Sequence, residues 1–553
     1  MSDGATPARR SAAPLWPTAV WLVVTAIILV ARPPMVDLEL PVHAAAWWAW
    51  TGHGTVPYLR ELSTDTPPLL FWCIRIGWEV LGAGEIWARL VASLFGLAAL
   101  WLMVPVARLL WPADGDAARF APIILGGSGG FVSFLALTEF AWPLLFFDLL
   151  SFYAVLLAAR RRSSIGWSLY AAALALGEVS AGAVSLWHML PVALAMPLAQ
   201  PELRNRALAH WWLRGAVATL AGVAAAALCL AWTVGAPLSG DHGGLVERLL
   251  LRGPPGSTDS DRPWYWYILI AWLLLYPWLW WPPLWRSFVR ASHRGSSALR
   301  PCWLAAVIIS AVTLVGGRQT SDLLPALPPL ALIAARVWSS HTSKAKDFHA
   351  AVPGLLALFV CLFFFMLNIV PVAQLDAVWR RLFAADLPIW LGGLSLASGI
   401  TLLTGSYLLA LLAPRGARAR LNQLALLPVL LSLTVSLEFA ISLWPFFDVT
   451  PIAQHIRALQ DAGRAVAVYK YYAGEFDAVG QLQLPPTILE DVPAALAWAG
   501  AHHDGVIVSF FRGGVLHLPE QPIYLGHADT HRAALWSSAT VIATEGAVLQ
   551  RRF

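Results

Sequence analysis

The sequence predicts a polytopic α-helical membrane protein with a small α/β domain at its C-terminal end. Hydrophobic residues make up 58% of the 553 residues and charged residues only 12%, whereas charged residues form about a quarter of an ordinary globular chain. Apolar runs of roughly 17–22 residues, the length that crosses the hydrocarbon core of a bilayer, recur from residue 15 to residue 444. After that point the pattern changes to short amphipathic segments, which are typical of a folded domain.

The apolar runs predict about thirteen transmembrane helices. In chain order, the predicted helices are 15–31, 90–110, 120–137, 143–159, 165–178, 184–199, 215–235, 264–285, 302–315, 323–338, 352–371, 388–413 and 423–444.

The basic residues orient these helices in the membrane. Arginines cluster in every second connection, for example at 160–162 and 415–420. Because cytoplasmic connections are enriched in Lys and Arg, we expect the N-terminus in the cytoplasm. The connections 32–89, 236–263 and 316–322 and the C-terminal domain then lie on the opposite side of the membrane. The first apolar run is followed by no small-residue cleavage site, so we expect it to stay as a helix.

Composition excludes several classes of protein. The net charge of +5 would fit a nucleic-acid partner, but the arginine clusters are explained by topology, and we predict no nucleic acid. The four cysteines lie in or beside apolar runs without the spacing of metal ligands, which argues against a disulfide framework and a zinc site. The sequence contains neither a Walker loop nor a Gly-x-Gly-x-x-Gly element, which argues against a nucleotide donor.

The tail after residue 444 reads as an independent α/β unit. The segments "TPIAQHIRALQDAG" and "EDVPAALAWAGAHH" predict helices. The segments "RAVAVYKYY", "DGVIVSFF" and "ATVIATEGAVL" predict strands. Its length of roughly 110 residues is common for a domain, so we divide the chain into a transmembrane domain, 1–444, and a C-terminal domain, 445–553.

The first outer connection, 32–89, concentrates polar residues at the outer membrane face. Asp37 and Glu39 follow the first helix, and His43 and His53 come next. Charge alone predicts solvated loop acids and surface histidines. The segment "HAAAWWAWTG" predicts a stretch along the membrane surface, with its tryptophans at the level of the lipid headgroups.

The order of motifs in this connection carries further information. Asp37 is followed by "GTVP", "TPPLLFW" and "GAGEIWARL". This series resembles the first loop of the membrane glycosyltransferases of the GT-C class, in particular the bacterial aminoarabinose transferase and protein O-mannosyltransferase-like family. In that family an Asp-Glu pair follows the first helix. Here Leu38 takes the place of the second acid, and Glu39 follows one position later.

Later segments resemble the same family in the same order along the chain. The segment "LALTEFAWPLLFFDLL" places Glu139 where the family carries an acid on the outer side. The segments "DRPWYWYILIAWLLLYPW", "GGRQTSDLLPALPPLALIAAR" and "VAVYKYYAGEFDAVGQLQ" follow. The resemblance therefore touches the whole chain, and it implies the GT-C fold.

The resemblance also implies an activity: a sugar passes with inversion from a polyprenyl-phosphate carrier to a cell-envelope acceptor such as lipid A. A hydroxyl acceptor needs a base, for which Asp37 is the first candidate, and Glu39 and Glu139 are the other candidate catalytic acids. A cation should meet the departing phosphate, and Arg318 is the first candidate. The other residues expected to bind the donor phosphate or its carrier are Arg252, Arg262, Tyr265, Tyr267 and Asp65.

The expected partners are a carrier-linked sugar, a lipid or glycan acceptor and membrane lipids, and the expected location is the bacterial inner membrane. We predict no cofactor, with a divalent metal as the alternative. A transporter or flippase, an inactive envelope scaffold and, within the class, a protein O-mannosyltransferase stay open. Most of the predicted helix interiors lack ionisable residues, which favours catalysis at the outer face over transport.

Overall fold

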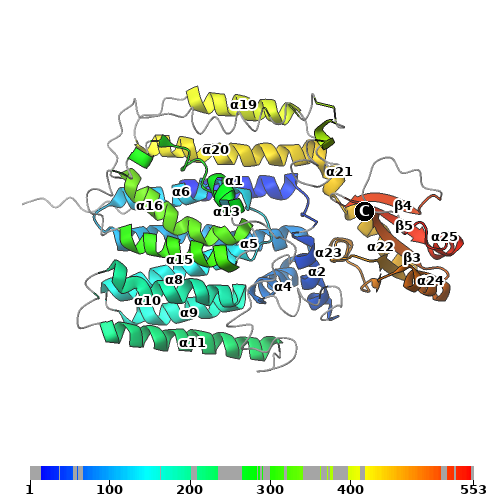
Figure 1. Cartoon of the computed structure of the whole chain (residues 1–553), viewed down its shortest axis with the longest axis horizontal. Coiled ribbons are helices and arrows are strands. Elements are labelled where there is room, and N and C mark those ends of the chain that lie inside the picture. The colour runs from blue at the N-terminus through cyan, green and yellow to red at the C-terminus, as the bar shows by residue number, and fades with distance from the viewer. Residues whose placement is uncertain are drawn as a thin grey trace, which may run out of the picture.

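The computed structural model describes residues 14–36, 38–53, 59, 67–161, 163–200, 203, 208–234, 265–282, 284–286, 289, 299–316, 320–339, 362, 366, 370–371, 374–377, 396–411, 417–511, 520–528 and 531–549. The helices pack side by side into a bundle, and an α/β unit adjoins one end of it along the long axis of the molecule (Figure 1).

The bundle and the connections at its ends are built from helices. These are α1 (Leu15–Ala31), α2 (Leu40–Thr51), α4 (Leu69–Leu81), α5 (Glu85–Leu110), α6 (Gly115–Gly126), α7 (Gly129–Ser133), α8 (Ala141–Arg161), α9 (Ser164–Ala181), α10 (Ala183–Ala199), α11 (Leu208–Val234), α13 (Tyr265–Leu274), α15 (Arg300–Gly316), η4 (Thr320–Ala326), α16 (Leu327–Ser339), α19 (Leu396–Leu411), α20 (Ala417–Glu438), η7 (Phe439–Leu443) and α21 (Trp444–Phe447).

The bundle has the dimensions and the surface of a membrane domain. Within the described ranges, four helices are long and apolar enough to cross a membrane: Glu85–Leu110, Ala141–Arg161, Leu208–Trp232 and one within Arg418–Asp461. Shorter apolar helices such as α1 and α10 run alongside them. Large apolar side chains on α11 and α15 are exposed, as a bundle surrounded by lipid requires.

Several predicted helices are broken in the structure. The prediction of one helix over 120–137 is wrong, because α6 ends at Gly126 and α7 is a separate short helix. A Cβ at Gly127 would lie 2.4 Å from the Cβ of Ala425 in α20, so this glycine lets two backbones approach closely. The predicted helix 264–285 ends as α13 at Leu274 and continues in turns.

Other predicted helices differ at their ends. The predicted helix 323–338 begins as a 3-10 turn, η4, before α16. The predicted helix 423–444 begins earlier, at Ala417, and closes in the π-helical turn η7. Most of the predicted helix 352–371 lies outside the described residues.

A five-stranded sheet forms the core of the C-terminal unit, with the strand order β2-β1-β3-β5-β4. Strand β1 pairs in parallel with β2 and β3, and β5 pairs antiparallel with β3 and β4. The elements are α22 (Thr450–Asp461), β1 (Val466–Tyr469), α23 (Asp477–Gly480), β2 (Thr487–Leu489), α24 (Val492–Ala501), β3 (Val506–Phe511), β4 (Tyr524–Ala528), β5 (His531–Ser537) and α25 (Ser538–Ala543). Strands β2, β4 and β5 were not predicted.

One predicted strand in this unit is wrong. The segment "ATVIATEGAVL" forms α25 and a following turn, not a strand. The hydroxyl oxygen of Ser537 accepts a hydrogen bond from the backbone N–H of Thr540 at 3.1 Å, which caps the helix and starts it directly after β5.

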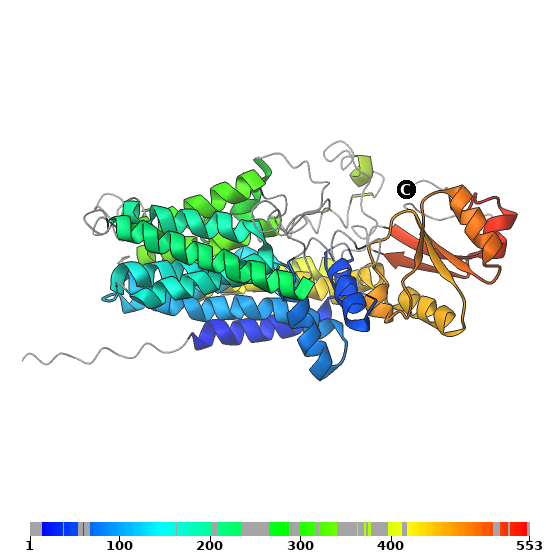
Figure 2. The same cartoon turned by 90° about the horizontal axis from the view of Figure 1, so that it is seen from below.

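Helix α2 stands between the bundle and the C-terminal unit (Figures 1 and 2). The prediction that its tryptophans lie at headgroup level is wrong for Trp47 and Trp48, which are buried. Their indole N–H groups donate to the backbone oxygen of Leu482 at 3.0 Å and to a carboxylate oxygen of Asp477 at 2.7 Å. A buried indole N–H needs an acceptor, and the C-terminal unit supplies one to each ring.

A contact between a carboxyl group and an imidazole ring is buried inside the bundle between α8 and α10. Nδ1 of His188 lies 2.6 Å from an oxygen of Asp148, and both side chains are almost fully buried.

Hydrogen bonds to charged groups contribute about 1.5–3 kcal/mol. The D148N variant is therefore expected to lose about that much free energy of unfolding, seen as a lower unfolding temperature in detergent. The D504N variant, which changes an exposed aspartate, should unfold like the wild type, and equal losses in both variants would contradict this role.

Candidate active site

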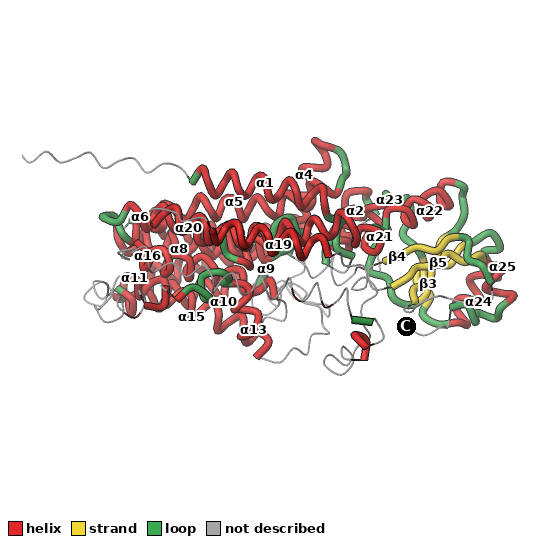
Figure 3. The backbone as a smooth tube through the Cα atoms, turned by 90° about the horizontal axis from the view of Figure 1, so that it is seen from above, coloured by secondary structure: helices red, strands yellow, loops and turns green. Residues whose placement is uncertain are grey.

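Three connections meet where the bundle adjoins the C-terminal unit: residues 32–39, residues 134–140 and η4. The first follows α1, the second links α7 to α8, and the third follows α15. Side-chain contacts of Glu39 and Glu139 join all three. The tube in Figure 3 places this end of the bundle next to α2, α21 and α23.

Glu39 is the centre of this cluster and is fully buried. One carboxylate oxygen lies 3.5 Å from a guanidinium nitrogen of Arg32 and accepts the backbone N–H of Met35 at 2.9 Å. The other lies 3.4 Å from Nε of Arg89 and accepts the backbone N–H of Thr138 at 3.1 Å. The prediction of a solvated loop acid is wrong, because Glu39 joins residues 32–39 to the connection 134–140.

The two arginines also converge on one backbone carbonyl. Arg32 and Arg89 donate to the oxygen of Ala136 at 2.9 Å and 3.1 Å. Ala136 has a φ of 56°, an unusual value for a residue with a side chain, and its N–H donates to the hydroxyl oxygen of Ser93 at 2.8 Å. These contacts hold the connection 134–140 in one conformation. Burial lowers the pKa of Arg32 to about 10, so this arginine stays charged at neutral pH and two cations face the single carboxylate of Glu39.

His43 is not the surface residue that the sequence predicts. It is buried in α2, and its Nε2 lies 2.9 Å from the hydroxyl oxygen of Thr138. Burial lowers the pKa of His43 to about 4, while the charge of Glu39 opposes this shift and the charge of Arg89 adds to it. The ring is therefore neutral at physiological pH, and it ties α2 to the connection that carries Glu139.

Glu139 lies in the connection between α7 and α8 and is largely buried. Burial raises the pKa of its carboxyl group to about 8, and the charges of Asp322 and Glu39 act in the same direction. A hydrogen bond with Ser321 of η4 opposes that shift. Glu139 is therefore mostly protonated at neutral pH, so its carboxyl group is suited to donate a hydrogen bond or a proton.

This protonation predicts a pH dependence of stability. A carboxyl group whose pKa is higher in the folded than in the unfolded protein favours folding at low pH, and that contribution is lost as pH rises towards the folded pKa. We expect the unfolding temperature of the wild type to fall between about pH 4.5, the ordinary value, and about pH 8. The E139Q variant should show a smaller fall across that range in thermal unfolding, and an unchanged fall would mean that Glu139 is ionised throughout.

Of the predicted carrier-binding residues, Tyr267 is described and lies beside the cluster. It is buried in α13 in an apolar cluster with Leu323 of η4, and Phe134 of the connection 134–140 packs against that cluster. Tyr265 begins α13, but its side chain lies outside the described residues. The residues Asp37, Asp65, Arg252, Arg262 and Arg318 lie wholly outside them. Asp37 is flanked by the described Val36 and Leu38, and Arg318 lies two positions before the first residue of η4, Thr320.

Sequence reasoning missed part of this cluster. The motif "GAGEIWARL" contains Arg89 but assigns it no role, and the sequence motifs do not mark Arg32, His43 or Thr138 as site residues. One signal in the sequence does point to Arg89. It stands in an apolar run shortly after a glutamate, and a charged residue in such a run needs a buried partner.

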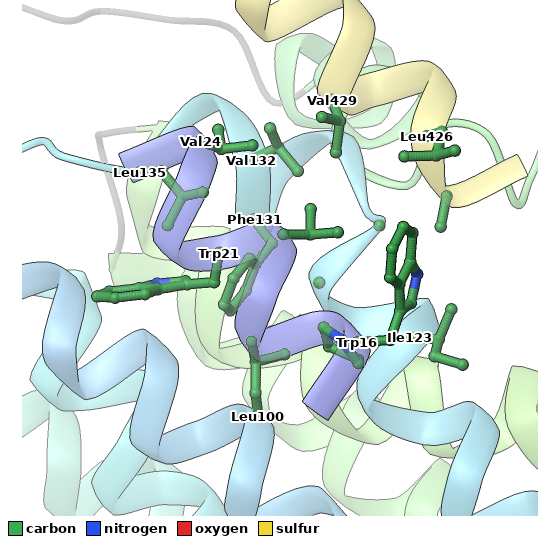
Figure 4. Close-up of a pocket in the computed structure, with 15 residues that line it drawn as sticks. Trp16, Trp21, Val24, Leu100, Ile123, Phe131, Val132, Leu135, Leu426 and Val429 are labelled. Atoms are coloured by element: carbon green, nitrogen blue, oxygen red, sulfur yellow. The ribbon is translucent and has the colours of Figure 1, made fainter. Parts of the chain in front are cut away.

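An apolar pocket lies elsewhere, between α1, α6, α7 and α20. Figure 4 shows Trp16, Trp21 and Phe131 among the side chains around it. Its lining has no ionisable side chain, so it offers no acid, base or phosphate ligand. The cluster around Glu39 and Glu139 is therefore the candidate active site. Among the described residues, no group of three or more His, Cys, Asp or Glu side chains is arranged to hold a metal ion.

Comparisons with known proteins point to one group. No known family model matches the sequence. A curated protein of Pseudomonas paraeruginosa, named undecaprenyl phosphate-alpha-4-amino-4-deoxy-L-arabinose arabinosyl transferase, is 24% identical over 303 residues, 53% of this chain and 53% of that protein. A protein of the same name from Pseudomonas savastanoi pv. phaseolicola is 23% identical over 317 residues, 55% of this chain and 57% of that protein. The chain thus spans about half the length of the curated relatives it matches.

Solved structures match over nearly the whole chain. The crystal structure of ArnT from Cupriavidus metallidurans in the apo state has a TM-score of 0.69 and 17% identity, covering 94% of this chain and 97% of that one. ArnT from the same organism bound to undecaprenyl phosphate has a TM-score of 0.66 and 16% identity, with the same coverage. The chain therefore has the fold of ArnT, and the predicted resemblance to the aminoarabinose transferase family is confirmed.

Proposed function

We propose that this protein is an integral membrane glycosyltransferase. It transfers a sugar from a polyprenyl-phosphate carrier to a cell-envelope acceptor, such as lipid A, on the non-cytoplasmic side, with inversion. The observation that carries the proposal is the cluster of buried acids and arginines at one end of a bundle that shares the fold of ArnT. The relatives named as arabinosyl transferases, and the ArnT structure with undecaprenyl phosphate, support a lipid-linked donor.

The finer topology belongs to the same proposal. The chain crosses the bacterial inner membrane about thirteen times, with a cytoplasmic N-terminus and a boundary between residues 444 and 445. The C-terminal domain then lies on the side where the acids meet. Support comes from the positions of the arginine clusters and from the cluster's place at the end of the bundle that adjoins the C-terminal unit.

The proposed roles of Glu39 and Glu139 follow from their burial and contacts, and those of Asp37 and Arg318 follow from the resemblance to the glycosyltransferase family. Asp37 is the base that takes the proton of an acceptor hydroxyl. Glu39, whose two oxygens are occupied by arginines and backbone N–H groups, holds the connections in place instead of reacting. Glu139, protonated near neutral pH, donates to an oxygen of a substrate. Arg318 meets the phosphate that departs from the sugar.

The remaining predicted residues form the path of the carrier. Tyr267 lies against η4, the segment that follows Arg318. We assign Arg252, Arg262 and Asp65, which lie in the predicted outer connections, and Tyr265, which begins α13, to the same path of the carrier. An arginine is suited to this role because its guanidinium group binds two phosphate oxygens at once.

One observation favours a different function. Asp148, His188 and Glu178 are buried inside helices of the bundle, and ionisable residues within membrane helices often mark the path of a transported ion or proton. A transporter for a charged lipid or sugar is therefore the second candidate.

A transfer assay separates the two candidates. The purified full chain in lipid nanodiscs is given radiolabelled polyprenyl-phosphate sugars, aminoarabinose first, with lipid A as acceptor. Label in lipid A supports the transferase. No transfer from any donor of the panel, together with uptake of label into sealed proteoliposomes, would establish the transporter and overturn our proposal.

A further inference from the structure

The contact between α2 and the C-terminal unit is too specific to be simple packing. Both oxygens of Asp477 are engaged: one accepts the indole N–H of Trp48 at 2.7 Å, and the other accepts the hydroxyl of Tyr472 at 2.6 Å. Asp477 and Trp48 are both fully buried. A buried carboxylate is costly unless its oxygens are satisfied, so this aspartate fixes the place of both rings.

The backbone is fitted to the same contact. Gly474 has a φ of 85°, and a Cβ there would lie 2.5 Å from the Cβ of Ala44 in α2. Only glycine allows this close approach with that backbone conformation. The indole N–H of Trp47 donates to the backbone oxygen of Leu482, two residues beyond the end of α23. Residues 472–482 of the C-terminal unit therefore form a seat for α2.

The other end of α2 belongs to the candidate active site. Glu39 directly precedes the helix, and the backbone N–H of His43 donates to the oxygen of Glu39 at 3.0 Å. His43 in turn contacts Thr138, which precedes Glu139. Because α2 has only 12 residues, a tilt at its tryptophans shifts Glu39, which directly precedes the helix.

We propose that Asp477 is a positioning residue for the transfer reaction, acting through Trp48 and α2 on the acids of the first outer connection. The C-terminal domain then completes the active site without touching the substrate. This inference rests on the proposed function, in which Asp37 is the base. Misplacing a reacting group by about 1 Å costs on the order of 10²-fold in rate, so a small shift of α2 has a large effect.

The kinetic test uses the full chain in nanodiscs. The D477N variant should lower kcat by about 10-fold to about 10²-fold, with the KM for the carrier-linked sugar changed by less than about 2-fold. The W48F variant, which keeps an aromatic ring and loses only the N–H, should show a loss of the same order. The double variant should be no slower than the slower single one, because both changes remove the same contact. Additive losses, or a loss confined to KM, would overturn the positioning role.

The matched control is D461N. Asp461 is an acid of the same domain at the end of α22, half exposed and paired with Arg457 at 3.0 Å. Its kcat should equal that of the wild type. A D461N loss as large as that of D477N would mean that any weakening of the domain slows transfer, and it would overturn the inference.

A second measurement does not depend on activity. Hydrogen exchange of the full chain should become faster in D477N and W48F at residues 40–51 and at the amide of Thr138, which is bonded to Glu39. Exchange in β3, at the centre of the sheet, should stay as in the wild type. If the wild type transfers no sugar, the proposed function fails and exchange alone decides the inference. Unchanged exchange at Thr138 would overturn the inference even if the wild type is active.

Discussion

Replacing Asp37 by asparagine is expected to slow sugar transfer by about 10²–10⁴-fold, the usual contribution of a general base. Asparagine keeps the size of the side chain but has no basic oxygen that could take the acceptor's proton. The KM for the carrier-linked sugar should change little, because the proposed donor contacts come from other segments. Initial rates with a radiolabelled polyprenyl-phosphate sugar in nanodiscs measure this effect.

The control for this prediction is D116N, which changes an exposed aspartate at the start of α6, paired with Arg119 at 3.4 Å. It should transfer sugar at the wild-type rate. A D37N variant that retains more than about a tenth of the wild-type rate would exclude Asp37 as the base. The acid would then have to be sought among the remaining carboxylates of the outer connections.

The second large effect is expected from Glu39. In the E39Q variant, Arg32 and Arg89 stay buried without a counter-charge, and the new NH2 group faces a backbone N–H that has lost its acceptor. Removing one partner of a buried ion pair costs about 3–5 kcal/mol. We expect a large drop in unfolding temperature, measured in detergent at one scan rate because unfolding of such proteins is often irreversible.

The chain offers a matched control for this change. Glu79 pairs with Arg75 at 3.0 Å in α4, and both side chains are more than half exposed. A surface pair contributes about 0–1 kcal/mol, so E79Q should unfold close to the wild type. If E39Q unfolds no earlier than E79Q, the buried cluster does not hold the connections together.

The class of fold could be predicted because it depends on composition and on the length of apolar runs, which are local properties. The predicted helix 15–31 coincides with α1. The surroundings of Glu39 could not be predicted, because Arg89 and Thr138 lie far from it in the chain and meet it only in the folded bundle. The sequence gives the charge of a side chain, but only the fold determines whether that side chain is exposed to water.

The errors in the C-terminal unit have a similar origin. The run that forms α25 is apolar and rich in β-branched residues, which favours a strand. The cap at Ser537 outweighs that preference. Strand β2 has only three residues and pairs with β1, so its own sequence carries too little signal for a strand to be predicted.

The tryptophans of α2 illustrate the limit most clearly. Tryptophan near a membrane surface usually belongs to the interfacial belt. This general tendency is the reason that the sequence predicts these tryptophans at the level of the lipid headgroups. The acceptors that the structure provides instead, Asp477 and Leu482, come from the other end of the chain. No pattern within residues 40–51 indicates them.

The seat of α2 also sets an order in time for biosynthesis. Trp48 leaves the ribosome 429 residues before Asp477, its partner. At roughly 5–20 residues per second, this gap lasts about 20–90 s. During that interval the indole N–H groups of Trp47 and Trp48 lack their acceptors in the C-terminal unit, so α2 is not yet held in its final position. A chain whose synthesis stops before Asp477 therefore carries Glu39 without the seat that aligns α2, so the synthesis of residues 472–482 decides when α2 reaches its final position.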